Sequence, residues 1–385
     1  MSRDSHHAES KESRSLQALR AEIDGVDHEI LRLLAKRNAI VGRIAEFKRT
    51  HRIGIRDLSR EAEIITDRRA LAASLGFSPA VVESVFRLVL AASRDRQAEL
   101  KVEVPPDVEP RQVAIIGGKG GMGRCLAGVF TDLGHTVVIA DLDTPVSPEQ
   151  AAGHADVVVI SVPIESTIEV IRRIGPLVRA DALLMDVTSI KEAPVRAMLE
   201  NTQASVIGTH PLFGPSVHTV QGQRIVLTPG RGDEWASWLR QNLSARGLAV
   251  CEATAEEHDQ AMAIVQVLTH FSTEVMGRTL ARLDAPVART LEFTSPIYLM
   301  ELIMTARHFA QSADLYASIQ MSNPRTAQVT GEFIAAAQEL RDAVTDGDRE
   351  AFRRLFAEVQ QHLGSFRDQA LDQSSYLIDR LVERA

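Results

Sequence analysis

The sequence predicts three domains: an all-helical N-terminal domain, a central α/β domain with a doubly wound parallel sheet, and an all-helical C-terminal domain. Apolar residues recur every three or four positions before about residue 100 and after about residue 254, a spacing typical of helices. Between these regions, short apolar runs rich in β-branched residues alternate with helical stretches, as in a parallel sheet covered on both faces. A chain of 385 residues is also too long for a single hydrophobic core.

The composition limits the class of protein. Hydrophobic residues make up 45% and charged residues 24%, which is ordinary for a globular protein. The net charge of −8 argues against nucleic acid as the main partner. No apolar run reaches the roughly 18 residues of a membrane helix, and residues 1–14 lack the apolar core of a signal peptide. We therefore expect a cytoplasmic protein that does not contact the membrane, with residues 1–14 as a disordered tail.

Residues 15–100 are predicted to form the N-terminal helical domain. A first helix of about 35 residues carries a continuous apolar seam, and such a helix needs partner helices or a second chain to be stable. A break is expected at Ile53-Gly54, followed by a second helix over about 57–75. Ser78-Pro79 should open a third helix, with the serine as cap and the proline in the first turn.

The remaining chain is divided by a linker. Residues 101–111 hold three prolines and are predicted to be extended. The α/β domain is expected over 112–253 and the C-terminal helical domain over 254–385. Strands of the parallel sheet are predicted at 113–116, 136–139, 157–160 and 182–185.

A glycine-rich loop follows the first predicted strand and has the pattern G-x-G-x-x-G. Gly118 permits a tight turn, Gly120 lets the backbone approach a pyrophosphate, and Gly123 lets the helix pack closely on the strand. The unpaired amides at the start of the helix would then bind the phosphates. This pattern predicts a Rossmann dinucleotide site, with a merely flexible loop as the alternative.

The end of the second predicted strand indicates which dinucleotide is bound. Asp141 follows that strand about twenty residues after the glycines, where a carboxylate accepts the ribose hydroxyls and repels a 2′-phosphate. NAD is therefore preferred over NADP. Asp143 is a competitor for this role, and a solvated turn residue is the alternative. Further candidates for cofactor binding are Met122 in the glycine loop and, after the third strand, Ser161, Val162 and Pro163.

The segment Gly208–Pro215, with the sequence G-T-H-P-L-F-G-P, contains a candidate catalytic residue. His210 lies between an apolar strand-like run and a loop rich in proline and glycine, so it should be held rigidly. The near-neutral pKa of histidine suits a group that takes a hydroxyl proton while a hydride leaves the same carbon. A purely structural histidine is the alternative.

This segment resembles the signature of prephenate dehydrogenases, and further similar motifs follow in that family's order from about residue 112 to the C-terminus. They are 162–164, 186–191, 257–260, 268–271 and 295–298. The resemblance implies that His210 deprotonates the ring hydroxyl as hydride moves to NAD, after which the ring becomes aromatic and loses CO2. Arg307 would bind a substrate carboxylate, and Leu299 stands where some members carry a basic residue, which leaves a second carboxylate contact in doubt.

The same resemblance implies further roles, each with a structural alternative. Ser189 and Lys191 would line the site near the nicotinamide, and His270 would lie in the substrate pocket. Lys191 could instead be a solvated lysine at a helix start, His270 a histidine of a helical core, and Arg307 a member of a surface ion pair.

Three cations on the first helix suggest a second site. Arg37 and Lys48 are eleven residues apart, which places them on nearly the same face, ~16 Å apart along the axis. Arg20 lies about 25 Å from Arg37 and on another face. If all three serve one site, Arg20 must come from a second, antiparallel chain, which predicts a dimer.

The motifs at Leu16–Asp24, Leu33–Arg37 and Arg56–Glu61 resemble the all-helical chorismate mutases over about residues 15–100. The resemblance implies a site for a pericyclic rearrangement in which Lys48 and Gln97 donate to the ether oxygen, where charge grows. A helical dimerisation arm with solvated cations is the alternative. The implied site residues are Arg20 of the partner subunit, Arg37, Lys48, Asp57, Arg60, Glu61, Ser93 and Gln97.

Together the resemblances imply a bifunctional chorismate mutase/prephenate dehydrogenase of tyrosine biosynthesis. Such a protein would be a homodimer that uses NAD, needs no metal, and is inhibited by tyrosine. A dehydrogenase of arogenate or of a β-hydroxyacid is one alternative, and the sequence leaves the choice between prephenate and arogenate open. A non-catalytic NAD-binding regulator is another, but it would not need both His210 and Arg307.

Overall fold

The N-terminal domain consists of three helices in the computed structural model. The second and third begin where the sequence predicts: the Asp57 side chain caps one by accepting the backbone N–H of Arg60 at 3.0 Å, and Pro79 is the first residue of the other. Their bounds are α1 Asp4–Thr50, α2 Leu58–Ser74 and α3 Pro79–Glu99. The structure describes residues 4–50, 57–99, 109–217, 219–284 and 286–382.

Helix α1 is longer than predicted. The disordered tail expected over residues 1–14 is instead helical from Asp4 onward, while residues 1–3 lie outside the described part. Extending an existing helix gains one hydrogen bond for each residue fixed, so a polar segment can continue it. The predicted break at Ile53-Gly54 and residues 101–108 of the predicted linker also lie outside the described residues.

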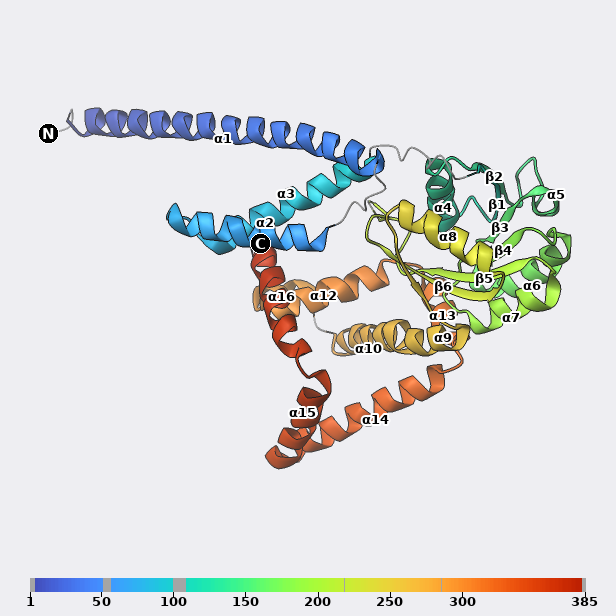
Figure 1. Cartoon of the computed structure of the whole chain (residues 1–385). Helices are drawn as coiled ribbons and strands as arrows, with labels where there is room; N and C mark the ends of the chain where they lie inside the picture. The colour runs from blue at the N-terminus through green and yellow to red at the C-terminus, as the bar shows by residue number, and fades with distance from the viewer. Residues whose placement is uncertain (1–3, 51–56, 100–108, 218, 285, 383–385) are drawn as a thin grey trace.

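The apolar seam of α1 is largely uncovered. Leu19 is 55% exposed and Ile23 is 60% exposed, whereas Val41, nearer the C-terminal end, is buried. Figure 1 shows α3 approaching α1 near that end, so the N-terminal half of α1 extends past the other two helices. A long helix with an exposed apolar seam needs a further partner, as the sequence predicted.

The central domain is built on a seven-stranded sheet with the order β2-β1-β3-β4-β5-β6-β7. The first five strands are parallel, but β6 is antiparallel to β5, so the sheet is mixed rather than entirely parallel as predicted. The chain returns after Pro211 through a loop without a crossover helix, and such a return can only give an antiparallel neighbour. The strands are β1 Gln112–Ile116, β2 Thr136–Ala140, β3 Val157–Ile160, β4 Leu183–Asp186, β5 Ser205–Pro211, β6 Arg224–Arg231 and β7 Ala249–Glu252.

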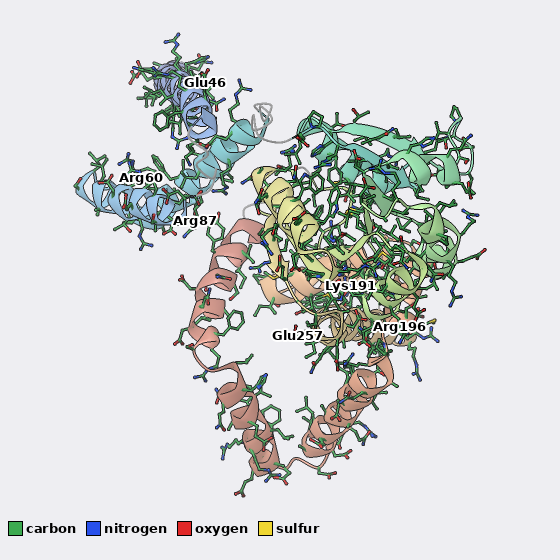
Figure 2. All side chains as sticks on the ribbon, turned by 45° about the vertical axis from the view of Figure 1, so that its right-hand side comes forward. Glu46, Arg60, Arg87, Lys191, Arg196 and Glu257 are labelled. Carbon is green, nitrogen blue, oxygen red and sulfur yellow. The ribbon has the colours of Figure 1, made fainter. Side chains whose placement is uncertain are left out.

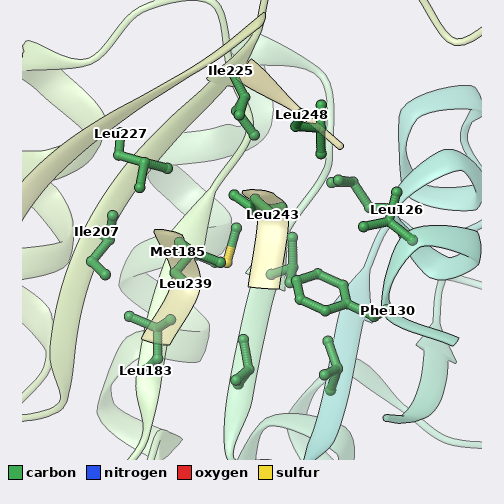
Figure 3. Packing of buried hydrophobic residues seen from close by; sticks show 14 of the residues in the cluster. Leu126, Phe130, Leu183, Met185, Ile207, Ile225, Leu227, Leu239, Leu243 and Leu248 are labelled. Carbon is green, nitrogen blue, oxygen red and sulfur yellow. The ribbon is translucent and has the colours of Figure 1, made fainter. Parts of the chain in front are cut away.

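Helices cover both faces of the sheet, which makes the domain doubly wound as predicted. On one face Leu126 and Phe130 of α4 pack with Leu239 and Leu243 of α8 on the strands (Figure 3). The other face is covered by α5, α6 and α7, with Ile171 among the buried residues. These helices are α4 Gly121–Asp132, α5 Pro148–His154, α6 Ile164–Ile174, α7 Glu192–Asn201 and α8 Asp233–Ala245, with a short 3-10 turn at Gly175–Leu177.

The C-terminal part is entirely helical in its described residues, as predicted. Its first helix, α9, is capped by Thr254 and continues into a π-helical segment, η2, at Ala263–Leu268. Figure 1 shows α14, α15 and α16 extending away from the sheet. None of the described helices is long and apolar enough to cross a membrane. The α-helices are α9 Ala255–Met262, α10 Thr269–Arg282, α11 Val287–Glu292, α12 Pro296–Phe309, α13 Ala313–Ser322, α14 Thr326–Thr345, α15 Arg349–Leu363 and α16 Phe366–Val382.

Candidate functional site

The glycine loop joins β1 to the start of α4. Gly117 has φ +78°, and a Cβ on it would lie 2.4 Å from the carbonyl oxygen of Ser161. The loop therefore lies directly against the segment Ser161–Pro163 at the end of β3, which the sequence predicted to contact the cofactor. No side chain caps the N-terminus of α4, so its first amides are available to phosphate oxygens.

The three glycines predicted from the sequence all lie in this loop. A Cβ on Gly123 would lie 2.7 Å from the Cα of Gly118, and one on Gly118 would lie 2.9 Å from the carbonyl oxygen of Ile115. Gly120 is the N-cap of α4. Met122, also predicted to bind the cofactor, packs its side chain partly against the hydrophobic cluster of Leu126 and Phe130.

Asp141 lies at the end of β2 and faces the glycine loop. Its carboxylate accepts the backbone N–H of Lys119 at 3.0 Å and that of Leu142 at 2.9 Å. Asp143 is more exposed and forms an ion pair with the amine of Lys119 at 2.7 Å, which lowers the pKa of Asp143. The carboxylate next to the glycines is thus that of Asp141.

His210 is almost completely buried near the end of β5, opposite Val226 of β6. Its Nδ1 lies 2.8 Å from Nε2 of His258, and its Nε2 lies 3.3 Å from the side-chain nitrogen of Gln266. Burial holds the pKa of His210 well below its usual range, and the positive charge of Lys191 acts in the same direction. Its imidazole is therefore neutral at neutral pH.

The loop after β4 is fixed by buried ionic contacts. Lys191 is completely buried, and its amine donates to the carboxylate of Asp186 (Figure 2 labels Lys191). The same carboxylate accepts the backbone N–H of Thr188 at 3.0 Å. Burial lowers the pKa of Lys191 against the attraction of Asp186. The alternative of a solvated lysine is wrong, and the half-buried Ser189 lies between these two fixed positions.

A second group of predicted residues gathers around Tyr316 of α13. The ring of His270 lies 4.7 Å from that of Tyr316, and the charge of Arg307 acts on the Tyr316 hydroxyl. Among the described residues Arg307 forms no ion pair. Nδ1 of His270 is buried without a hydrogen-bond partner. Gln266 and His270 are one turn apart on the same continuous helix, which joins this group to His210.

Only part of the predicted mutase site is brought together within one chain. Arg37 of α1 donates to the hydroxyl of Ser93 on α3. Burial lowers the pKa of Arg37. Gln97 donates to the carbonyl of Ser93 at 3.1 Å, and its own oxygen is buried without a partner.

The other residues predicted for the mutase site make contacts of their own, separate from the hydrogen bond between Arg37 and Ser93. The pKa of Asp57 is lowered by hydrogen bonds from Ser59 and from the Arg60 backbone, with a further contribution from the charge of Lys48. Glu61 forms an ion pair with Arg94 at 2.8 Å, and the Arg60 guanidinium pairs with Glu63. Arg20 is exposed on the uncovered half of α1.

The sequence matches three protein families in succession. Residues 19–98 match chorismate mutase type II, residues 125–251 the nucleotide-binding domain of prephenate dehydrogenase, and residues 254–358 the prephenate dehydrogenase dimerization domain. The chain is 36% identical to the T-protein of Enterobacter agglomerans, over 94% of this chain and 97% of that one. The chain belongs to the T-protein family. It is therefore a bifunctional enzyme, a chorismate mutase and an NAD-dependent prephenate dehydrogenase.

Two further comparisons agree with this membership. The T-protein of Haemophilus influenzae is 32% identical over 95% of this chain and 97% of its own. The structure of prephenate dehydrogenase from A. aeolicus, solved with hydroxyphenyl propionate and NAD+, covers 67% of this chain and 99% of its own with a TM-score of 0.55. At 16% identity that likeness shows a shared fold.

The structure of this T-protein family member adds residues that the sequence analysis did not single out. Gly117 is the glycine with the left-handed backbone, and its signal was its place directly after the strand. His258 lies in the motif at 257–260, but nothing in the sequence marks Gln266, because a π-helical turn cannot be recognised from the spacing of apolar residues.

In this family member, replacing Gly123 with alanine is expected to raise the Kd of NAD by at least about tenfold. The added Cβ would meet the backbone of Gly117 and Gly118 at less than 3 Å, so the loop must move away from the helix. Gly128→Ala in the same helix is the control, because a Cβ there meets nothing within 4 Å. Calorimetric titration with NAD measures both; an unchanged Kd in the Gly123 variant would contradict this account of the loop.

Proposed function

We propose that Nε2 of His210 accepts the proton of the substrate hydroxyl during prephenate oxidation. The observation that carries this proposal is a buried imidazole whose Nε2 faces a polar side chain, Gln266, rather than a charged partner. Bound NAD supplies the hydride acceptor. His210 takes the hydroxyl proton as the hydride leaves the same carbon. The ring carboxylate then leaves as CO2, and the electrons of the broken bond stay in the ring and make it aromatic. The proton then returns to the phenolate oxygen.

The second group of residues is suited to hold the substrate. We assign the unpaired charge of Arg307 to a substrate carboxylate and the unpaired Nδ1 of His270 to another polar group of the substrate. The buried oxygen of Gln266 also lacks a partner. Buried polar atoms without partners are costly, and a polar ligand removes that cost. Ser189 and Lys191 then border the nicotinamide, and Asp141 with the loop 117–123 and the segment 161–163 binds the rest of NAD.

The low pKa of His210 predicts how kcat/KM for prephenate oxidation changes at acid pH. The residue acts in its neutral form, and burial keeps it neutral below the ordinary histidine value of about 6.5. We expect kcat/KM for prephenate oxidation to stay constant as the pH falls to about 6.5 and to decline only below it. Steady-state rates from pH 5 to 8 test this, and a decline with its midpoint above about 6.5 would contradict it.

We propose that the enzyme is a homodimer in which Arg20 of the partner subunit completes each mutase site. The uncovered seam of α1 supports this, as does the match of residues 254–358 to a dimerization domain. Arg20→Ala and Arg37→Ala should each be inactive as mutases. Mixed after dissociation, they should regain about a quarter of wild-type mutase activity, because half the dimers are hybrids with one intact site. If the mixture stays inactive, Arg20 acts within its own chain or not at all.

The remaining expectations follow the family resemblance. We propose a cytoplasmic enzyme of tyrosine biosynthesis that tyrosine inhibits, with functional units at 15–100, 112–253 and 254–385. The test is to supply chorismate with and without NAD, in the presence and absence of tyrosine. Loss of chorismate without NAD and NADH formation with NAD, the latter suppressed by tyrosine, would support the proposal. NADH formation unaffected by tyrosine would remove the regulatory part alone.

A further inference from the structure

Two buried side chains, those of His258 and Asp259, continue from His210 in a line of hydrogen bonds. His258 and Asp259, both on α9, have side chains that are 0% and 1% exposed. Nε2 of His258 lies 2.8 Å from Nδ1 of His210, and Nδ1 of His258 lies 2.7 Å from Oδ1 of Asp259. The two imidazole rings are nearly perpendicular, with 67° between their planes.

The direction of each hydrogen bond follows from Asp259. Its Oδ1 accepts the backbone N–H of Lys191 at 2.7 Å and its Oδ2 accepts that of Glu192 at 2.9 Å. Both oxygens thus act as acceptors toward the start of α7, and a carboxylate can only accept hydrogen bonds. Nδ1 of His258 therefore donates to Asp259, and when that is the single proton on the ring its Nε2 accepts from Nδ1–H of His210.

The same logic leaves Nε2 of His210 without a proton. A neutral imidazole that carries hydrogen on Nδ1 has its lone pair on Nε2. The contact with Gln266 agrees with this, because an amide nitrogen only donates and so requires an acceptor at the His210 Nε2, 3.3 Å away. The atom that faces the substrate side is thus the one able to take a proton.

We propose that His258 and Asp259 are positioning residues that hold His210 in the tautomer with a bare Nε2, ready to accept the substrate hydroxyl proton. The inference rests on the proposed role of His210 as the base. After His210 has taken the proton at Nε2, its Nδ1–H still donates to the lone pair of His258. The Asp259 carboxylate then stabilises the positive charge of His210 through His258. No oxidant or further reactant is needed, because the proton returns to the product oxygen.

The geometry around α9 makes this arrangement rigid. Asn323 donates to the backbone carbonyl of Asp259 at 2.8 Å. Arg325 links Glu192 of α7 to Glu256 of α9 through ion pairs at 2.9 and 3.4 Å. Contacts from α7 and from the residues after α13 therefore fix α9, which carries His258 and Asp259. The arrangement of these side chains beside His210 does not depend on bound substrate.

The test compares Asp259→Asn with wild-type enzyme. An asparagine that keeps its oxygen at the Oδ2 position, toward the Glu192 amide, puts its NH2 group at the Oδ1 position, where it would no longer accept from Lys191 and would donate to Nδ1 of His258. Both imidazoles would reverse their tautomers and place a hydrogen on Nε2 of His210. A reversed tautomer of a catalytic histidine lowers kcat by up to about 10⁴-fold, and we expect a loss of at least about 10²-fold in prephenate oxidation. The KM of prephenate and the Kd of NAD should change by less than about threefold.

A spectroscopic readout separates this role from a purely structural one. Long-range ¹H–¹⁵N spectra of histidine-labelled enzyme should report hydrogen on Nδ1 of His210 in the wild type and on Nε2 in Asp259→Asn. His258→Gln retains an acceptor oxygen for His210 and should keep much more kcat than His258→Leu, which has none. Thr254→Ala is the matched control, since it removes the cap of α9 without touching the three side chains.

The outcomes are distinct. Oxidation by Asp259→Asn within about threefold of wild type would overturn the inference, as would equal losses in His258→Gln and His258→Leu or a comparable loss in Thr254→Ala. If His210→Asn itself remained active, the proposed function would fail instead. An inactive His210→Asn beside an active Asp259→Asn would leave His210 as the base and remove only the positioning residues.

Discussion

His210→Asn is expected to lower kcat for prephenate oxidation by about 10²- to 10⁴-fold, the usual contribution of a positioned acid–base group. Asparagine is close in size and can still accept the contact from Gln266, so the pocket should keep its shape. It cannot take a proton, however, and the hydroxyl proton would have to pass to water, which the 3% exposure of His210 largely excludes. Initial rates of NADH formation with prephenate and NAD measure the effect.

The bifunctional chain provides an internal control for this variant. Chorismate mutase activity in His210→Asn should equal that of the wild type, because the mutase residues lie on α1, α2 and α3. His154→Asn is the matched control. It makes the same substitution at a histidine outside the site, at the end of α5. A variant that oxidised prephenate normally would exclude His210 as the base.

Lys48→Ala should produce the corresponding loss in the other activity. A donor aimed at an atom where charge develops contributes about 10²- to 10³-fold to kcat, and Lys48 is the cation we assign to the ether oxygen of chorismate. The charge of Lys48 already acts on the carboxylate of Asp57, the residue that caps α2, and helps to lower the pKa of that carboxylate. The loss should appear in kcat measured by the disappearance of chorismate.

The comparison variant for Lys48 is Lys36→Ala. Lys36 is exposed on the same helix and has no assigned role, so its loss removes an equal charge without changing the site. Both variants should oxidise prephenate at the wild-type rate. Equal mutase activity in the two would show that any cation on α1, rather than Lys48 in particular, is sufficient.

Features determined by local chemistry were predictable from the sequence, and those determined by distant contacts were not. Asp57 and Pro79 mark helix starts through their own side chains and were predicted correctly. The antiparallel placement of β6 depends on a return loop and on pairing with β5, which no local pattern reveals. The tail before residue 15 was misjudged because its polarity suggested disorder, although it can extend an established helix.

The same distinction applies to the site. His210 was predicted from its segment, but its partner His258 lies 48 positions later and the pairing is visible only in the fold. Lys191 could be taken for a solvated residue because the sequence does not indicate that Asp186 is buried beside it. Arg37 and Ser93 are 56 positions apart, and only the family resemblance put them in one site.

The π-helical segment Ala263–Leu268 sets the phase between two halves of one helix. A π-turn accommodates one residue more than an α-turn, so the same residues wound as an ordinary α-helix would add one residue's rotation. The part after the segment would then rotate by roughly 100° relative to the part before it. With α9 anchored by Asp259, His270 would turn away from Tyr316 and Arg307. The wider turn thus keeps Gln266 beside His210 and His270 beside Tyr316 on one continuous helix.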